Sequence, residues 1–368
     1  MRCGTSRAIL YPPAKRIEKK LSAKRSRNSA PDDAASLIAS SQKARSEKTW
    51  IITDGSVGME AQGIAVAEAV GLPFSLRRVR TTGAMKFLPT PLQLLLTPAR
   101  LLRSVAANEK LEAPWPRLII SIGRRSVPIA LAIKRLSKPH AFALHIQNPK
   151  VPARLFDLIA APVHDGFEAP NVVTTFGAVH SVTPERLAEA GKRYAPRIEA
   201  LPHPRVSVLL GGESQAFSFP PEIAASLGAK LASLARDTQG SLLVTPSRRT
   251  RADSLAVLTA AIKDVPHSVW DGTGENPYFA FLALADAIVV TEDSVNMVTE
   301  AAGTGKPVYV QSLAGRSSRL SRFHRLMQER SATRPFEGRL EAWSYAPIND
   351  TELVASIIRR ALGLEIKN

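Results

Sequence analysis

The chain has 368 residues, enough for about two domains, and its composition of 45% hydrophobic and 22% charged residues is that of a globular protein. Cys3 is the only cysteine, which excludes an intrachain disulfide and favours a reducing, cytoplasmic environment. No apolar run reaches about 18 residues, so we expect no membrane-spanning helix.

The net charge of +17 is unevenly distributed. Residues 1–48 hold twelve Lys and Arg against four Asp and Glu, a net +8, in a Ser/Ala/Lys-rich segment without periodicity. We expect this leader to be disordered, as a solvated tail, a basic membrane-surface arm or a transit peptide. The remaining +9 suits an acidic ligand or peripheral contact with an anionic membrane, such as the inner face of the cell membrane. We expect no nucleic-acid partner.

A first series of strands and helices is predicted over residues 49–202. Short apolar runs closed by turn residues indicate strands, and apolar residues at helical spacing indicate helices. The strands are expected at 49–55, 74–80, 117–123, 141–147, 156–162 and 171–177, and the helices at 58–71, 126–136 and 183–195.

The alternation restarts after two prolines at 201–208. This second series, over 203–345, has strands expected at 205–212, 240–246, 267–272, 286–291 and 306–312, and helices at 220–236, 252–263, 277–285, 294–302 and 318–329. A final helix within 346–368 stands apart and is free to cross back to the first domain. The pattern predicts an α/β protein with two doubly wound, Rossmann-like domains facing a cleft.

The stretch "EAAGTGKPVYV" at 300–310 resembles a phosphate-binding P-loop at first sight. A P-loop requires glycine at the position that is here Glu300 and Ser or Thr at the position that is here Pro307. It also requires a strand before the loop, whereas a helix is expected there in this chain. We therefore expect the glycines to end a helix and Lys306 to begin a strand.

The other end of the same helix is a better candidate for an anion site. A helix beginning at Ser294 offers unpaired backbone N–H groups and a positive dipole end. Glu292 and Asp293 next to it would repel a phosphate unless cations lie nearby, and the three residues together equally suit a simple helix cap. Such cations are available in "TPSRRTR", where Ser247, Arg248 and Arg249 follow an earlier strand of the same sheet.

A nucleobase slot is the hypothesis for "WDGTGEN" at 270–276. Trp270 is an aromatic residue at a strand end, and Gly272 and Gly274 let a planar ring approach the backbone. Asn276 starts the next helix. A turn followed by a capped helix explains the same residues equally well.

In the first domain, polar residues follow several predicted strands. A glycine-rich segment occupies 53–63, and further polar side chains are Arg124, Arg125, Gln147, Asn148, Lys150 and His164. His145 and Asp165 are guesses for a catalytic base. We expect no metal site, because no H-E-x-x-H or close Cys/His pair occurs, and no serine-hydrolase elbow.

The stretch at 300–310 is similar to the E-A-x-x-x-G-K-P-V segment of GT-B glycosyltransferases. The span from Trp50 to about Gly363 more closely resembles the mitochondrial fission ELM-type proteins of plants and proteobacteria, a family regarded as glycosyltransferase-like. The matching stretches are "WIITDGSVGMEAQ", "HIQNPKVPARLFDLIAAPVHD", "GAVHSVTPERL", "LLGGES", "LLVTPSRRT", "WDGTGENPYFAFLALADAIVVTEDSVNMVTEA" and "GTGKPVYV".

The resemblance implies a transferase that binds a nucleotide-diphosphate sugar, with Glu300 at the ribose and the helix N-terminus at Ser294 receiving the diphosphate. The sugar nucleotide would be the donor substrate, so no cofactor is expected, and the acceptor is unknown. The alternative is a non-catalytic adaptor that recruits a dynamin-like or other membrane-division partner. An epimerase would share the nucleotide site but would need more carboxylates.

Overall fold

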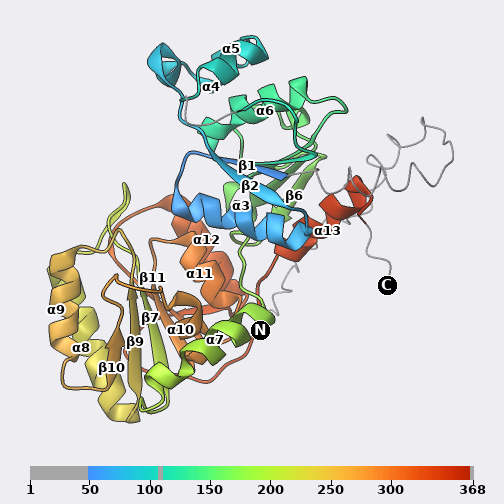
Figure 1. Cartoon of the computed structure of the whole chain (residues 1–368). Helices are drawn as coiled ribbons and strands as arrows, with labels where there is room; N and C mark the ends of the chain where they lie inside the picture. The colour runs from blue at the N-terminus through green and yellow to red at the C-terminus, as the bar shows by residue number, and fades with distance from the viewer. Residues whose placement is uncertain (1–48, 107–110, 365–368) are drawn as a thin grey trace, which may run out of the picture. The chain divides into compact units, whose positions relative to one another are not determined.

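The computed structural model describes residues 49–106 and 111–364, and the leader at 1–48 lies outside them. The chain forms two compact units (Figure 1). The first comprises residues up to Thr175 together with those from Glu352 onward, and the second runs from Phe176 to Thr351.

The first unit is built on a six-stranded parallel sheet in the order β2-β1-β3-β4-β5-β6. Its strands are β1 (Thr49–Thr53), β2 (Phe74–Arg78), β3 (Leu118–Ile122), β4 (Phe142–Ile146), β5 (Leu158–Pro162) and β6 (Val172–Thr175). Its helices are α3 (Val57–Val70), α4 (Thr90–Gln93), α5 (Pro98–Arg103), α6 (Val127–Leu136) and α13 (Thr351–Leu362), with short 3₁₀ turns η1 (Gly83–Phe87), η2 (Arg124–Ser126), η3 (Ala153–Leu155) and η4 (Val163–Asp165).

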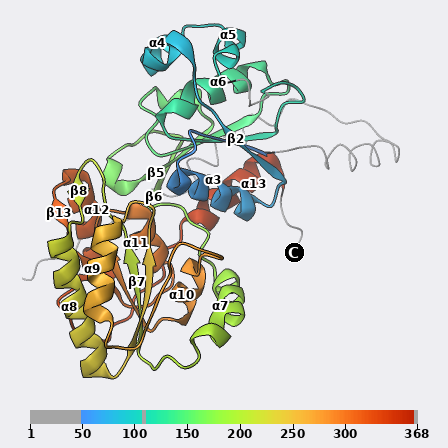
Figure 2. The same ribbon diagram turned by 60° about the vertical axis from the view of Figure 1, so that its left-hand side comes forward.

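Helices cover both faces of this sheet, which explains why its central strands are continuous apolar runs. In both views α6 lies on one face and α3 on the other (Figures 1 and 2). Ile52 and Ile119 pack in the same buried cluster as Ile129 of α6. On the opposite face, Gly63 of α3 lies so near Ile51 that a Cβ there would stand 2.6 Å from its methyl carbon. That glycine allows α3 to pack closely against the sheet.

The last helix, α13, groups with the first unit although it ends the chain. The guanidinium of Arg359 donates to the carbonyl of Ala69, and Arg117 donates to the carbonyl of Leu362. Val354, Ala355 and Ile358 of α13 have no exposed surface. The helix therefore completes the core of a domain that begins some 300 residues earlier in the chain.

The second unit has a six-stranded parallel sheet in the order β10-β9-β7-β11-β12-β14. Its strands are β7 (Arg205–Leu210), β9 (Ser241–Pro246), β10 (His267–Val269), β11 (Ala287–Thr291), β12 (Val308–Gln311) and β14 (Thr333–Pro335), and β8 (Phe217–Ser218) pairs with β13 (Ala314–Gly315) in a small antiparallel ribbon. Its helices are α7 (Pro184–Ile198), α8 (Pro221–Thr238), α9 (Ala252–Ile262), α10 (Tyr278–Leu284), α11 (Val295–Ala302) and α12 (Ser318–Glu329).

The expected domain boundary at residue 203 is wrong, because α7 belongs to the second unit. The ring of Tyr194 on α7 packs edge-on against Phe281 of α10 at 5.4 Å, and a Cβ on Gly191 would meet the Ala283 methyl at 3.2 Å. α7 and α10 together cover the face of the sheet opposite α8 and α9 (Figures 1 and 2). The two prolines at 201–208 mark a turn inside the unit.

Across the described residues, none of the helices is long and apolar enough to span a lipid bilayer.

Candidate functional site

The sheet of the second unit has a topological switch point between its two central strands. The chain moves from β7 outward to β9 and β10, and then returns to the other side of β7 to form β11 and β12. Counted from β7 along the main sheet, the order is 3-2-1-4-5-6, as in Rossmann domains, in which ligands bind beyond the carboxyl ends of the strands at this point. The segments that follow β7, β9 and β11 are therefore the candidate site.

Two consecutive glycines after β7 bring its backbone against the segment after β11. The Gly211 N–H donates to the Thr291 hydroxyl at 2.7 Å, and the Gly212 N–H donates to Oδ2 of Asp293 at 3.2 Å. A Cβ on Gly211 would stand 2.1 Å from Oδ1 of Asp293, and one on Gly212 would stand 2.1 Å from the Arg249 carbonyl. Only glycine fits this approach at both positions.

The Asp293 carboxylate is buried and bonded to other residues of the protein. Its side chain has no exposed surface, and it accepts hydrogen bonds from Thr291 Oγ1 at 2.7 Å and from Gly212. Arg249 Nη2 lies 2.6 Å from its Oδ2. The negative charge that would repel a phosphate at this helix start is therefore neutralised. The same pairing occupies Arg249, one of the two arginines expected to contact phosphate.

Arg248 and Ser247 have different surroundings. Arg248 is exposed, and no hydrogen bond or ion pair holds it within the part of the chain that the structure describes. Ser247 is half-buried, and its hydroxyl donates to the Gly211 carbonyl at 3.2 Å and accepts from the Arg249 N–H. Ser247 thus fixes the loop after β9 to the glycine pair, and Arg248 remains available at its tip.

Ser294 caps α11, as the sequence indicated. Its Oγ accepts from the Met297 N–H at 3.3 Å, and its own backbone is extended. The N–H of Val295, the first helical residue, donates to no acceptor among the described residues. The start of α11 therefore presents a free backbone donor at the switch point.

Glu300 lies five residues further along α11 and is half-buried. Its Oε2 accepts a hydrogen bond from the Tyr278 hydroxyl of α10 at 2.6 Å. Burial raises the pKa of Glu300 to about 7, although the Tyr278 hydrogen bond and the charge of Arg186 both act to lower it. The carboxyl group is therefore close to half-ionised at neutral pH.

The loop between β10 and α10 is exposed and internally bonded. The Trp270 indole N–H donates to the Thr273 carbonyl at 2.8 Å, and Asn276 Oδ1 accepts from the Tyr278 N–H at 3.0 Å. Gly272 and Gly274 have φ angles of 89° and 65°, with no atom within 4 Å of a Cβ placed there. The loop therefore has open space beside its two glycines. It ends directly before Tyr278, the residue whose hydroxyl donates to Glu300.

Lys306 has no role at a phosphate in this structure. Its ammonium donates to the carbonyls of Leu282 at 2.8 Å and Ala283 at 2.5 Å, at the end of α10. Burial lowers its pKa to about 8. A cation at a helix C-terminus stabilises the helix dipole, so this lysine is a structural cap.

His145 lies inside the first sheet. It has no exposed surface, its Nδ1 is 2.9 Å from Ser121 Oγ, and its ring packs on Phe156 at 5.0 Å. Burial lowers its pKa to about 3. A neutral imidazole sealed in the core is poorly placed to take a proton from an acceptor, so His145 does not enter the function proposed below.

Asp165 lies at the carboxyl edge of the same sheet, in η4 after β5. Its Oδ1 is 3.8 Å from Nε2 of the buried His164, and its own side chain is one-tenth exposed. Of the two guesses for a base, this carboxylate is the one that reaches the surface.

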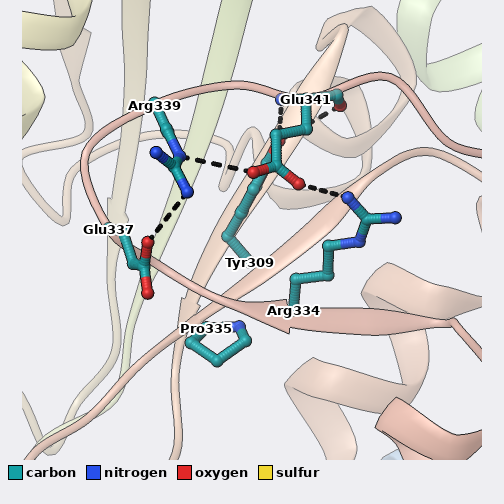
Figure 3. A pocket seen from close by; sticks show the side chains of 6 residues that line it. All are labelled: Tyr309, Arg334, Pro335, Glu337, Arg339 and Glu341. Atoms are coloured by element: carbon teal, nitrogen blue, oxygen red, sulfur yellow. Dashed lines mark hydrogen bonds and ion pairs between the residues drawn. The ribbon is translucent and has the colours of Figure 1, made fainter.

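A separate pocket of about 170 Å³ lies beside β12 and β14 (Figure 3). Its charges are paired with one another: Arg334 with Glu341, and Arg339 with both Glu337 and Glu341. The Tyr309 hydroxyl holds the backbone of Glu341. Ligand pockets are usually at least about 300 Å³. This pocket is too small for a nucleotide, and its lining charges already have partners within the protein.

Within residues 49–106 and 111–364, three His, Cys, Asp or Glu side chains nowhere gather closely enough to hold a metal ion.

Two elements of this site were not predicted from the sequence. Gly211 and Gly212 belong to "LLGGES", where two consecutive glycines directly after a strand are a detectable signal for close backbone approach. Tyr278 was missed because nothing in the spacing of α10 and α11 indicates which tyrosine meets Glu300.

The chain matches the family described as mitochondrial fission ELM1 over residues 57–362. The chain belongs to this family. It is 33% identical over 284 residues to the mitochondrial fission protein ELM1 of Arabidopsis thaliana, an alignment that covers 70% of this chain and 66% of the plant protein. It thus spans slightly less than two thirds of that relative. It is also 26% identical over 361 residues to the uncharacterized protein RP120 of Rickettsia prowazekii, covering 86% of this chain and 98% of RP120.

Among solved structures, the ELM1-family chain is similar to the UDP-GlcNAc 2-epimerase of Methanocaldococcus jannaschii in complex with UDP-GlcNAc and UDP. The TM-score is 0.52 at 14% identity, with 86% of this chain and 100% of the epimerase covered. This similarity shows the fold and no more. The expected class, two Rossmann-like α/β domains of the GT-B type, is confirmed.

Proposed function

We propose that the second unit binds a nucleotide-diphosphate sugar at its switch point and that the protein transfers the sugar to an acceptor. One observation carries the proposal. The glycine pair after β7, the start of α11 and the exposed Arg248 belong to segments that the sheet order brings to one carboxyl edge, and Asp293 beside them is already neutralised by Arg249.

The diphosphate would occupy the start of α11. The free N–H of Val295 and the helix dipole favour an anion there, and Arg248 supplies an exposed positive charge. Arg249 would act by holding Asp293 in place instead of touching phosphate. The same groups would stabilise the charge that develops on the diphosphate as it leaves, without requiring a metal ion.

The nucleoside would extend toward α10. Glu300 keeps one carboxylate oxygen free of Tyr278, and that oxygen can accept a hydrogen bond from a ribose hydroxyl. The loop at 270–276, with Trp270 and its two open glycines, would receive the base. A sugar nucleotide is bound by the similar epimerase, which agrees with this assignment of ligand class.

In the transfer step, the bond between the anomeric carbon and the diphosphate oxygen breaks and an acceptor oxygen bonds to that carbon. The nucleoside diphosphate leaves with the electron pair, and the acceptor's proton goes to a base.

The name of the plant relative favours a second candidate, a non-catalytic adaptor that recruits a dynamin-like or other division partner. Such an adaptor would keep the fold without needing Arg248. It would form a long-lived protein complex in pull-downs, and that complex would survive Arg248→Ala. In either case we propose a cytoplasmic protein that acts peripherally at the inner face of a membrane.

The test is mass spectrometry of small molecules that co-purify with the native protein, followed by calorimetry with UDP, GDP, ADP and their sugar conjugates. We expect one nucleoside diphosphate to bind and Glu300→Ala to weaken it at least tenfold, since a hydrogen bond to a charged group contributes about 1.5–3 kcal/mol. No binding by any of these nucleotides, or unchanged binding by the variant, would refute the proposal. Product analysis with the bound conjugate then separates a transferase from an epimerase.

A further inference from the structure

We propose that the segment from Arg80 to Arg103 of the first unit is a membrane-docking surface for anionic lipid. The inference does not depend on the nucleotide site, and it names the surface through which the peripheral membrane contact proposed above would form.

Three large apolar side chains are exposed on this segment. Phe87 is 78% exposed, Leu95 is 80% exposed and Leu92 is 48% exposed. Leu95 lies in the turn that follows α4, and its N–H donates to the carbonyl of Leu92 three residues earlier, which brings the two side chains to one side of the segment. Clustered apolar exposure of this kind marks an interaction site more often than an ordinary surface.

The segment is held firmly enough to present these side chains. Leu101 is wholly buried, and Met85, Leu94, Leu96 and Leu102 pack against the core of the first unit. Gln93 Nε2 donates to the carbonyls of Met85 and Leu88, which ties α4 to η1. The base of the segment is closed by backbone hydrogen bonds from Thr82 to Ser104 and from Ala106 to Arg80.

Its place in the first unit leaves it accessible. Both views show α4 and α5 on the outer side of α6, away from the sheet (Figures 1 and 2). They form a third layer, and the apolar side chains that are not used against α6 stay exposed.

The positive charge of this segment indicates an anionic partner. Residues 69–106 contain six Lys and Arg and no Asp or Glu. Within Arg80–Arg103 itself there are four cations, Arg80, Lys86, Arg100 and Arg103, and all four are exposed and form no ion pair with any described residue. Exposed apolar side chains among cations that have no acidic partner in the described residues match the headgroup region of an anionic bilayer. A protein groove is a poorer match, because α4 and α5 have only four and six residues.

The test is co-sedimentation of the full chain with phosphatidylcholine vesicles containing 30% phosphatidylglycerol, and with pure phosphatidylcholine vesicles. We expect binding to the anionic vesicles, weakened at least tenfold by F87S/L92S/L95S. We also expect a loss of about fivefold for each charge removed in R100Q/R103Q. The matched control K192Q/K263Q removes two exposed cations of the second unit and leaves the leader unchanged.

Equal losses in the control and in R100Q/R103Q, or no loss in the apolar triple variant, would overturn the proposal. A fluorophore at Leu95→Cys in a Cys3→Ser background provides a second measurement that does not depend on the leader. Its emission should shift to the blue when anionic vesicles are added, whereas the same label at Lys263→Cys should not respond. A shift that follows protein concentration without vesicles would instead indicate self-association and would contradict membrane docking.

Discussion

The pairing of Asp293 with Arg249 removes the main objection to the proposed anion site, which is the presence of two acidic residues beside it. In the sequence, Glu292 and Asp293 argue against phosphate binding and the two arginines argue for it. The structure assigns one arginine to Asp293 and leaves Arg248 exposed, and Glu292 accepts from the Leu313 N–H at 2.5 Å. The acidic residues therefore organise the backbone around the start of α11, and the positive charge remains available.

Glu300 gives a pH-dependent prediction. Burial raises its pKa to about 7 from an ordinary value of 4.5. Its contribution to stability is therefore complete below about pH 4.5 and is lost as the pH rises through 7. Glu300→Gln keeps an acceptor for Tyr278 but cannot ionise. Relative to wild type, it should gain up to about 3 kcal/mol of unfolding free energy between pH 4.5 and pH 8.

Urea denaturation at the two pH values measures this gain. Glu189→Gln, at an exposed glutamate of α7, controls for the loss of one carboxylate. An equal effect of Glu300→Gln at both pH values would show that Glu300 has the same pKa in the folded and unfolded chain.

At the scale of elements, Lys306 joins the start of β12 to the end of α10. Lys306→Met keeps an unbranched side chain that is one heavy atom shorter, and it removes two hydrogen bonds to helix carbonyls. We expect the free energy of unfolding to fall by about 1–3 kcal/mol. Nucleotide affinity should not change, because the lysine does not face the switch point. Loss of affinity without loss of stability would restore a phosphate-binding role for this residue.

Most strands and helices could be predicted because their patterns are local. Buried parallel strands between helices on both faces are short apolar runs, and Ser294 and Thr183 cap their helices as their positions indicate. Three features depend on packing between distant segments and could not be predicted. These are the assignment of α7 to the second unit, the pairing of Glu300 with Tyr278 and the burial of His145. The short helices α4 and α5 are too brief to show helical periodicity.

At the scale of the whole molecule, the second unit is one continuous segment whereas the first needs both ends of the described chain. A chain that ends at Thr351 would lose α13, including the buried Val354 and Ile358. Each buried side chain of this size contributes about 1.5–3 kcal/mol. We expect the first unit to melt at a lower temperature, or not to fold, while the transition of the second unit is retained.

Calorimetric melting and limited proteolysis measure this effect, with Phe176–Thr351 expected as the protected fragment. Simultaneous loss of both transitions would show that the second unit does not fold independently.

The most direct test of the account is the affinity of the co-purified nucleoside diphosphate for two arginine variants of the second unit. Arg248→Ala removes the exposed cation at the carboxyl edge of the sheet, and Arg236→Ala removes an exposed cation in the last turn of α8, the helix that returns the chain to the opposite edge. Isothermal titration calorimetry should show at least tenfold weaker binding for Arg248→Ala and wild-type binding for Arg236→Ala. Equal affinities for both variants would contradict a nucleotide site at the switch point.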